Sequence, residues 1–498
     1  MREDWMKVFL RRDDAGHDRG DAQMRKEFLA VFSGFPEHRF SEDTAKRLRE
    51  ELTVRRSIVF ITACPYEYAQ SDKDADGMHE MFAQQGIPFE RHCVIDRRTD
   101  PSEAKALVEH ADCIFLMGGG ACEEQLDLIR EKDCFEALLD CHAAILGVSA
   151  GSMNMARIVV DFHDSMEPFP GLGFTNLTVS CHHDPADAWR YEQTLKMSET
   201  RVVYAMEDLS AFFLKGGKIS VAGKVFRGEN RVLRPITEAD LRELEQDEFR
   251  RVFDTIPDQF DRFRPRYSGE LFAFLNRRAG IGPGKSVLEI GPGTGQATEP
   301  VLGTGCEYHA IELGEHLYRK MIGKFGKLPN FEIVNDDFIT HDFGDERFDM
   351  IYSAATIQWI PQDIAYARCF ELLKPGGTLA MMLTRSEYRS ENEPLYQEIQ
   401  ALYDRYYRPE IPYTHGNFDY TAAPGYGFSE VERFEFKGQR ILTADEYVRF
   451  SGTHCDHIVI PEPTRTEFFD GLRNAVLKAG DRIVFNDTYV LYLTKKPS

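Results

Sequence analysis

Long apolar segments are missing from this sequence. No run approaches the roughly eighteen apolar residues that a membrane-spanning helix needs, and the first stretch, MREDWMKVFLRRDD, carries charge throughout. We therefore expect neither a signal peptide nor a membrane span.

Paired cysteines are also missing. The ten cysteines are scattered, with no C-x-x-C pair and no histidine–cysteine cluster at the spacing of a zinc site. We expect free, mostly buried thiols in a reducing cytoplasm, with neither disulfides nor a bound metal.

Positive charge is scarce. The chain has 60 lysines and arginines against 82 aspartates and glutamates, which gives a net charge of −22. Such an excess of negative charge repels nucleic acid and anionic membrane surfaces. We expect a small-molecule or peptide substrate and no nucleic-acid or membrane partner.

The length of the chain predicts more than one domain. Its 498 residues, 42% of them hydrophobic, exceed what one core usually holds. Strands alternate with helices in both halves, which is typical of α/β domains with a parallel sheet covered on both faces. We predict an N-terminal extension with the first elements over 1–54, one domain over 55–236, a charged helical linker over 237–258 and a second domain over 259–498.

A G-x-S-x-G motif lies in the first half, where GVSAG (147–151) follows an apolar strand and precedes a run that can be helical. In that context a sharp turn holds the serine hydroxyl above the sheet. Backbone amides of Gly119, Gly120 and Ala150 would then surround a developing oxyanion. The pattern predicts that Ser149 is a nucleophile. In the alternative, the domain is no longer catalytic and the turn is retained only for packing.

Three segments of the first half together carry a resemblance to a known family. GGG (118–120), GVSAGSMN (147–154) and GLGFTNLTVSCHHD (171–184) resemble the dipeptidase E and cyanophycinase group of serine peptidases, over about residues 55–233. That group has the class I glutamine-amidotransferase-like fold.

The resemblance implies roles for three side chains. Ser149 would be the nucleophile, His182 the base and Asp164 the acid that orients the base. Where the peptidases usually have asparagine after the glycines, this chain has alanine. Other candidates for the base and for the acid stay open, namely His183, Asp161, Glu167 and Asp184.

A glycine-rich turn organises the second half. KSVLEIGPGTG (285–295) reads as a buried strand that runs into Gly291, Gly293 and Gly295, and Glu312 follows at the end of the next apolar run. Glycines let a ligand lie against bare backbone, and an acid at that position is placed to accept from ribose hydroxyls. The same pattern can hold NAD, but the G-x-G-x-G spacing and the acid inside the strand, Glu289, argue against it.

This segment resembles class I S-adenosylmethionine-dependent methyltransferases, with FDMIYSAATIQWIP (348–361) and LLKPGGTLAMM (372–382) as further matches. The likeness runs from about Phe260 to the last residue. It implies S-adenosylmethionine as the cofactor, with the loop from Glu289 to Gly295 around its methionine end and Glu312 on its ribose. Leu313 would line the adenine, Asp337 would accept from the adenine amino group, and Phe338 would complete the site.

Acceptor residues are less clearly marked. Arg264 and Arg266 precede the cofactor strand and would grip a carboxylate by paired hydrogen bonds, the alternative being exposed arginines at a helix cap. Trp359 follows the fourth strand, where acceptor and methyl group should meet, or else belongs to the core. Residues 388–425 are expected to form an inserted cap over the acceptor.

The sequence thus predicts two doubly wound α/β domains. The first has an amidotransferase-like, flavodoxin-type sheet and the second a Rossmann-like methyltransferase sheet with an antiparallel last strand. The predicted protein is bifunctional, combining serine-type peptide hydrolysis with methyl transfer. In one alternative only methyl transfer occurs and the first domain is a binding module; in another, both sites process one peptide-like metabolite.

Overall fold

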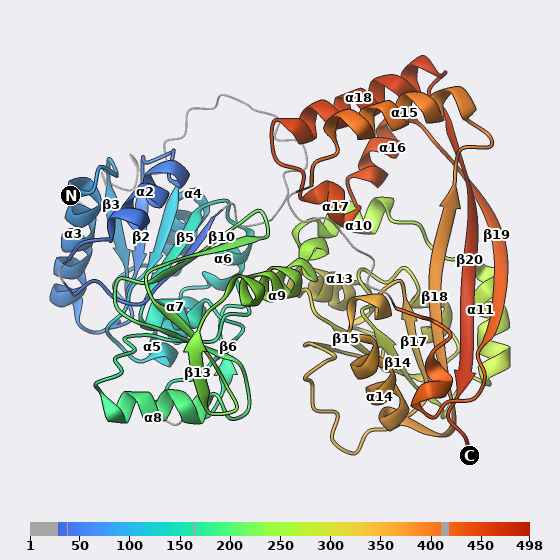
Figure 1. Ribbon diagram of the computed structural model, residues 1–498, viewed down its shortest axis with the longest axis horizontal. Coiled ribbons are helices and arrows are strands. Elements are labelled where there is room, and N and C mark those ends of the chain that lie inside the picture. Colours follow the sequence, from blue (N-terminus) through green and yellow to red (C-terminus); the bar gives the residue numbers. More distant parts are fainter. Residues whose placement is uncertain (1–27, 37, 164–165, 410–417) are drawn as a thin grey trace. The chain divides into compact units, whose positions relative to one another are not determined.

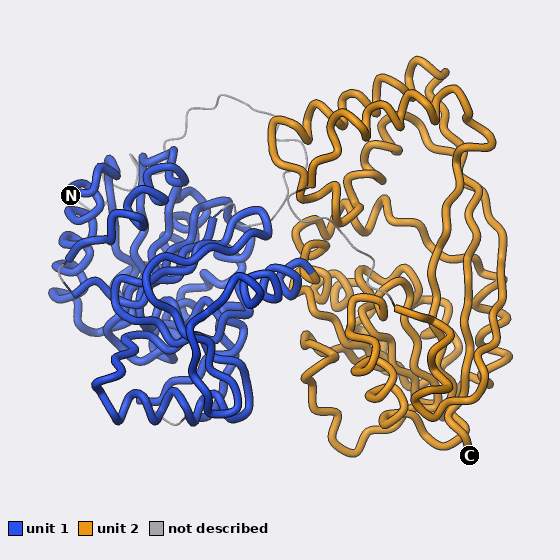
Figure 2. Tube along the Cα trace, in the orientation of Figure 1, with its two compact units in different colours: residues 1–249 blue, residues 250–498 orange. Residues whose placement is uncertain are grey.

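The computed structural model describes residues 28–36, 38–163, 166–409 and 418–498 (Figure 1). The chain divides into two compact units, Met1–Phe249 and Arg250–Ser498 (Figure 2). Both are built of alternating strands and helices, so the predicted α/β class is confirmed for each.

The first unit contains a seven-stranded sheet with the order β11-β10-β1-β5-β4-β2-β3. The five strands from β1 to β3 in this order are parallel to one another, whereas β10 is antiparallel to both of its neighbours, β1 and β11. The strands are β1 (Leu29–Phe32), β2 (Ile58–Ile61), β3 (His92–Ile95), β4 (Cys113–Leu116), β5 (Ala144–Val148), β10 (Ala211–Lys215) and β11 (Lys218–Ala222).

Both faces of this sheet are buried. Side chains of β2 alternate between two cores, with Val59 and Ile61 in one and Ile58 and Phe60 in the other, as a parallel sheet covered by helices requires. The helices are α2 (Glu42–Glu51), α3 (Tyr68–Gln84), α4 (Pro101–His110), α5 (Cys122–Glu131), α6 (Phe135–Asp140), α7 (Ala150–Asn154), α8 (Ala188–Met197) and α9 (Glu238–Phe249).

One strand of this sheet was not expected from the sequence. β1 lies between β5 and β10, yet it falls in the stretch before residue 55, where no strand was predicted. β10 and β11 form a hairpin, with Gly216 and Gly217 both at positive φ in its turn.

A smaller sheet, with the order β13-β12-β9-β8, completes the first unit. Its strands β8 and β9 are parallel neighbours, so their carboxyl ends lie at the same edge. The strands are β8 (Val179–Ser180), β9 (Val203–Met206), β12 (Val225–Glu229) and β13 (Val232–Pro235), and a separate pair is formed by β6 (Ile158–Val159) and β7 (Phe169–Pro170).

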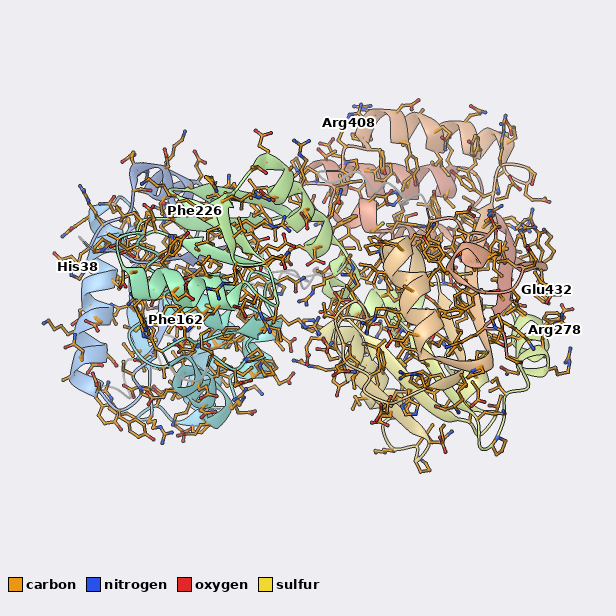
Figure 3. All side chains as sticks on the ribbon, turned by 60° about the horizontal axis from the view of Figure 1, so that its bottom comes forward. His38, Phe162, Phe226, Arg278, Arg408 and Glu432 are labelled. Atoms are coloured by element: carbon orange, nitrogen blue, oxygen red, sulfur yellow. The ribbon has the colours of Figure 1, made fainter. Side chains whose placement is uncertain are left out.

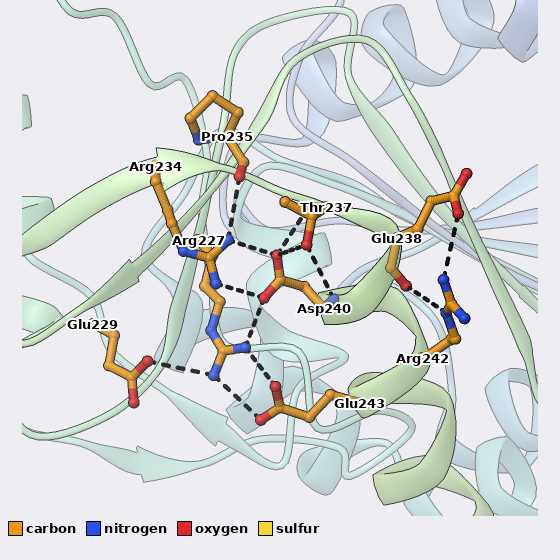
Figure 4. Close-up of polar contacts among 9 residues, drawn as sticks. All are labelled: Arg227, Glu229, Arg234, Pro235, Thr237, Glu238, Asp240, Arg242 and Glu243. Atoms are coloured by element: carbon orange, nitrogen blue, oxygen red, sulfur yellow. Dashed lines mark hydrogen bonds and ion pairs between the residues drawn. The ribbon is translucent and has the colours of Figure 1, made fainter.

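Helix α9 is attached to this smaller sheet by charged contacts (Figure 4). Asp240, which is buried, accepts hydrogen bonds from Arg227 of β12 at 2.8 Å and from both terminal nitrogens of Arg234 at 2.6 Å. Thr237 also donates to it, at the start of the helix. The hydrogen bonds from Arg234 outweigh the effect of burial and hold the pKa of Asp240 well below its usual range.

The second unit contains a seven-stranded sheet with the order β16-β15-β14-β17-β18-β20-β19. Strand β20 is antiparallel to both β18 and β19, which confirms the predicted antiparallel last strand. The strands are β14 (Ser286–Ile290), β15 (Glu307–Glu312), β16 (Phe331–Asn335), β17 (Phe348–Ala354), β18 (Leu373–Glu387), β19 (Glu432–Leu442) and β20 (Ile483–Lys495).

Helices cover this second sheet and extend beyond it. Beside the sheet, Arg278 of α11 pairs with Glu432 of β19 at 2.7 Å (Figure 3). The elements near the sheet are η1 (Val252–Thr255), α10 (Pro257–Phe263), α11 (Gly269–Ala279), α12 (Glu299–Leu302), α13 (Glu315–Phe325), η2 (Ile357–Trp359), α14 (Gln362–Leu372) and η3 (Ala423–Tyr426).

Four further helices form a cap with its own core. Figure 1 shows α15, α16 and α18 together at one end of the long strands β18, β19 and β20. Phe468 of α18 is fully buried and packs in one cluster with Ile399, Tyr447 and Phe485. The cap helices are α15 (Glu393–Tyr406), α16 (Ala444–Ser451), α17 (Cys455–Ile458) and α18 (Thr464–Lys478). The cap therefore comes from two segments, of which only the first overlaps the predicted insertion.

Across the described ranges, no helix is both long enough and apolar enough to cross a membrane. All ten cysteines are free thiols.

Candidate active sites

The turn after β5 holds Ser149 in a strained conformation. Ser149 has φ 53° and ψ −119°, a region that L-residues rarely adopt, and α7 begins at the next residue. Small neighbours make the turn possible, because a Cβ on Gly118 would lie 2.8 Å from the Ser149 Cβ and one on Gly151 would lie 2.2 Å from the Leu116 oxygen. The strained turn is the geometry expected of a nucleophile elbow.

His182 lies beside this serine. Its Nε2 is 2.9 Å from Ser149 Oγ, and its Nδ1 is 2.7 Å from Asp208 Oδ1. The histidine backbone is also fixed, because the His182 N–H donates to Ser33 Oγ at 2.7 Å. Serine, imidazole and carboxylate thus form one hydrogen-bonded chain, in which the imidazole can take the hydroxyl proton.

The acid in this chain is Asp208, which the sequence analysis did not name. Asp164, the acid expected there, lies outside the described residues. His182 follows β8 by two residues and Asp208 follows β9 by two residues, so the parallel pairing of these strands brings the two side chains together. The missed signal was an aspartate directly after an apolar strand.

The other candidates have different surroundings. His183 is buried against Tyr191 and Phe226, its Nδ1 has no hydrogen-bond partner among the described residues, and burial lowers its pKa. Asp161 accepts from the backbone of Cys122 and His163.

Glycines of two strand ends surround the serine and the histidine. A Cβ on Gly34, just after β1, would lie 2.4 Å from Asp208 Oδ1 and 2.5 Å from His182 Cε1. Gly119 has φ 106°, and a Cβ on Gly120 would lie 1.9 Å from the Ala63 oxygen. The oxyanion role expected of Gly119, Gly120 and Ala150 stays a prediction.

The second unit contains a cavity of about 730 Å³ at the carboxyl ends of its parallel strands. The predicted site residues that line it are Gly291, Gly293, Glu312, Leu313, Asp337, Phe338, Arg264 and Trp359. Of the predicted set, Glu289, Gly295 and Arg266 are not among the lining residues that the structure describes.

The loop after β14 is held open by glycine. Gly293 has φ 61°, and its N–H donates to Glu312 Oε2 at 2.9 Å. The Gly314 N–H donates to the other oxygen, Oε1, also at 2.9 Å. Burial raises the pKa of Glu312 to about 7, although both backbone hydrogen bonds lower it.

Glu289 lies behind this loop instead of in the cavity wall. It is fully buried, and its Oε2 accepts from Thr298 at 2.6 Å, from Tyr352 at 2.8 Å and from Tyr308. Burial raises its pKa, against the effect of these three hydrogen bonds. Glu289 therefore supports the loop from behind through these hydrogen bonds. The sequence analysis had expected it to line the cofactor site itself.

Gly295 also lies behind the wall, whereas Arg266 is exposed. A Cβ on Gly295 would lie 2.8 Å from the Phe325 ring, so this glycine allows α13 to pack closely. Arg266 donates to the Gly295 oxygen at 3.4 Å and lies 3.8 Å from Asp261.

Asp337 is paired with an arginine. Arg250 donates to both of its carboxylate oxygens, at 2.8 and 2.9 Å, and both residues line the cavity. The predicted acceptor residues Arg264 and Trp359 contact aromatic rings. Arg264 lies over the rings of Phe253 and Phe260, and Trp359 packs edge-on against Phe253.

Comparisons with known proteins match both units. Residues 28–222 match the family model of Peptidase family S51, and residues 288–381 match the model of a methyltransferase domain. The fusion predicted from sequence is therefore confirmed at the level of its two domains.

Individual curated relatives are methyltransferases. A sterol 24-C-methyltransferase of Eremothecium gossypii is 32% identical over 158 residues, which is 28% of this chain and 40% of that protein. A trans-aconitate 2-methyltransferase of Deinococcus radiodurans is 33% identical over 133 residues, covering 26% of this chain and 48% of that protein. The chain thus spans less than half the length of each of these curated relatives.

The chain is also similar to a solved peptidase structure. The crystal structure of a peptidase from an acI-B1 Actinobacterium covers 43% of this chain and 96% of its own, with 15% identity and a TM-score of 0.34.

Proposed function

We propose that this chain, a fusion of a Peptidase family S51 domain and a methyltransferase domain, is a bifunctional enzyme. Its second unit would transfer a methyl group from S-adenosylmethionine to a small-molecule or peptide-like acceptor, and its first unit would hydrolyse a peptide bond. The observation that carries the methyl-transfer proposal is the cavity that joins the glycine loop, Glu312 and an aromatic wall in one space.

The residues of this cavity suit the cofactor. Gly291 and Gly293 line the cavity at positive φ, and neither has room for a side chain, since a Cβ would lie 2.3 Å from Thr356 at the first and 2.9 Å from Phe260 at the second. Each oxygen of Glu312 has one backbone donor and keeps a lone pair for a ribose hydroxyl. When bound, the cofactor supplies a methyl group on a positively charged sulfur.

The chain's own residues would then position the reaction. Glu312 fixes the ribose, Leu313 and Phe338 cover the adenine on apolar surface, and Trp359 with Phe253 excludes water from the end of the cavity. Enclosure and alignment account for much of the rate of a displacement of this kind.

In the first unit the proposed reaction is acyl transfer. Ser149 Oγ attacks a peptide carbonyl while His182 Nε2 takes its proton, and Asp208 keeps the imidazole in the tautomer with hydrogen on Nδ1. Amides of Gly119, Gly120 and Ala150 face the developing oxyanion. His182 next returns the proton to the leaving amine, and water hydrolyses the acyl-serine.

One alternative keeps methyl transfer and makes the first unit a binding module. It is favoured by the exposure of the Asp208 side chain, 39%, because the acid of a working triad is usually buried. It is also favoured by Ala121, which replaces the asparagine expected for substrate binding.

We further propose that the acceptor is not a nucleic acid and that the protein works in the cytoplasm. The net charge of −22 supports the first point and the ten free thiols support the second.

Two measurements on the full-length chain test these proposals. Calorimetry with S-adenosylhomocysteine should give one binding site that is lost in Gly293→Val, because any side chain there meets Phe260. A serine-directed phosphonate should label the wild type and leave Ser149→Ala unlabelled, with Ser102→Ala, which changes an exposed serine of α4, as the control. Labelling that persists in Ser149→Ala would leave the binding-module alternative in place.

A further inference from the structure

Two amide side chains lie buried in the helices that follow β4 and β5. Gln125 belongs to α5, and Asn154 is the last residue of α7, the helix that begins directly after Ser149. Both side chains are 0% exposed. The same helices place Leu126 and Met153 in an apolar core, where a polar group needs hydrogen-bond partners.

The two amides form one network of hydrogen bonds. Asn154 Nδ2 donates to Gln125 Oε1 at 3.0 Å and to the carbonyl oxygen of Cys122 at 2.9 Å. Gln125 Nε2 donates in turn to the carbonyl oxygens of Met117 at 3.0 Å and Ile61 at 2.9 Å. The network thus connects α7, through α5, to the carboxyl ends of β4 and β2.

One atom of this network has no donor. Asn154 Oδ1 is buried and accepts no hydrogen bond from the residues that the structure describes. Turning the amide over would place this oxygen against the oxygens of Cys122 and Gln125, which only accept. Replacing two buried partners by apolar groups of the same shape is often nearly neutral for stability. Packing alone therefore does not account for this pair of amides.

The network reaches the main chain directly before the glycine run, Gly118–Gly120. Met117 precedes the run, and its N–H donates to the Ile61 oxygen at 2.9 Å. Because Gln125 binds its oxygen, Met117 is held through both its N–H and its carbonyl group. The start of the glycine run therefore has a fixed position relative to β2.

The glycine run packs against the serine. A Cβ on Gly118 would lie 2.8 Å from the Ser149 Cβ, and a Cβ on Gly120 would lie 1.9 Å from the Ala63 oxygen. The run thus lies between the turn that holds the serine and the residues that follow β2. Any shift of Met117 would move the amides of the run relative to Ser149 Oγ.

We propose that Gln125 and Asn154 are positioning residues of the first active site, an inference that rests on the proposed hydrolysis. Asn154 ties the helix of the nucleophile to Gln125, and Gln125 fixes the main chain that leads into the glycine run. Both side chains are fully buried, so they act without contacting the substrate. Together they set the distance between Ser149 Oγ and the amides that stabilise the oxyanion.

The rate of labelling by a fluorophosphonate tests this proposal on the full-length chain. Its reaction with serine builds negative charge on the phosphoryl oxygen, as acyl transfer does on the carbonyl oxygen. Gln125→Met has a similar length and makes none of these hydrogen bonds. Its maximal labelling rate, kinact, should fall about 10- to 100-fold, because a small misplacement of reacting groups has effects of this size. The half-saturating concentration of the probe, KI, should stay unchanged.

A second variant and a matched control separate positioning from stability. Asn154→Leu should also lower kinact, and the double variant should be no slower than Gln125→Met, because both residues act through one network. Leu128→Ala removes a fully buried apolar side chain from the same helix, α5. It should lower the midpoint of urea unfolding and leave kinact unchanged.

Three results would overturn the proposal: wild-type kinact in both Gln125→Met and Asn154→Leu, a loss that appears in KI alone, or an equal loss of kinact in Leu128→Ala. If circular dichroism shows that Gln125→Met does not fold, Asn154→Leu decides in its place. An unlabelled wild type is a different outcome, because it refutes the proposed hydrolysis and this inference with it.

Discussion

Glu312 gives the second unit a pH dependence that can be measured. Its pKa is raised to about 7 by burial, with Asp254 and Glu289 adding to the shift and the N–H groups of Gly293 and Gly314 opposing it. Ribose hydroxyls donate to the ionised carboxylate, so cofactor binding favours loss of its proton.

The size of the effect follows from the ionised fraction. With a pKa near 7, about nine tenths of Glu312 is ionised at pH 8 and about one tenth at pH 6. The Kd for S-adenosylhomocysteine should therefore be up to about tenfold weaker at pH 6 than at pH 8. Calorimetry in two buffers of different ionisation enthalpy at pH 6.5 should also detect release of part of a proton on binding.

The same shift has a consequence for stability. A carboxyl whose folded pKa lies above its unfolded value of 4.5 favours the folded state when protonated, and this contribution is lost as pH rises from about 4.5 through 7. The loss is about 3 kcal/mol above pH 7. Glu312→Gln should thus unfold at a higher temperature than wild type at pH 8 and at a similar one at pH 4.

The control is Glu332→Gln, which changes an exposed acid on β16. If S-adenosylhomocysteine binds equally at pH 6 and pH 8, or if Glu312→Gln keeps the wild-type pH dependence, then Glu312 does not hold the ribose as a carboxylate.

Three further predictions concern single side chains. Asp208→Asn should lower peptide hydrolysis or phosphonate labelling at least 10²-fold through loss of the His182 tautomer, measured as a labelling rate; an unchanged rate would exclude Asp208 from the reaction. Gly34→Ala should abolish labelling, because the new Cβ meets both His182 and Asp208, while S-adenosylhomocysteine still binds; normal labelling would contradict the close packing. Tyr352→Phe should destabilise the second unit by about 1–3 kcal/mol in urea unfolding, because Glu289 loses a buried hydrogen bond; an unchanged midpoint would mean that Glu289 is otherwise satisfied.

Local signals explain what could be predicted from sequence. The glycine loop after β14 and the elbow after β5 each combine an apolar strand, glycines at fixed spacing and a helix start within about fifteen residues. Ser149 and Glu312 were accordingly placed from such segments, whereas His182 came from the resemblance to the serine peptidases.

Long-range pairing explains what was missed. Asp208 meets His182 only because the two-residue strand β8 pairs with β9, which no local pattern indicates. Strand β1 is four residues long and is stabilised by neighbours more than a hundred residues away. The cap helices α16 and α18 join α15 only through tertiary packing.

Native mass spectrometry of the full-length chain tests the central claim, that one chain carries two separate sites. After incubation with a serine-directed phosphonate and S-adenosylhomocysteine, wild type should carry one covalent adduct and one bound nucleoside, and Ser149→Ala should carry the nucleoside alone. A wild-type chain without the adduct, or without the nucleoside, would contradict the account.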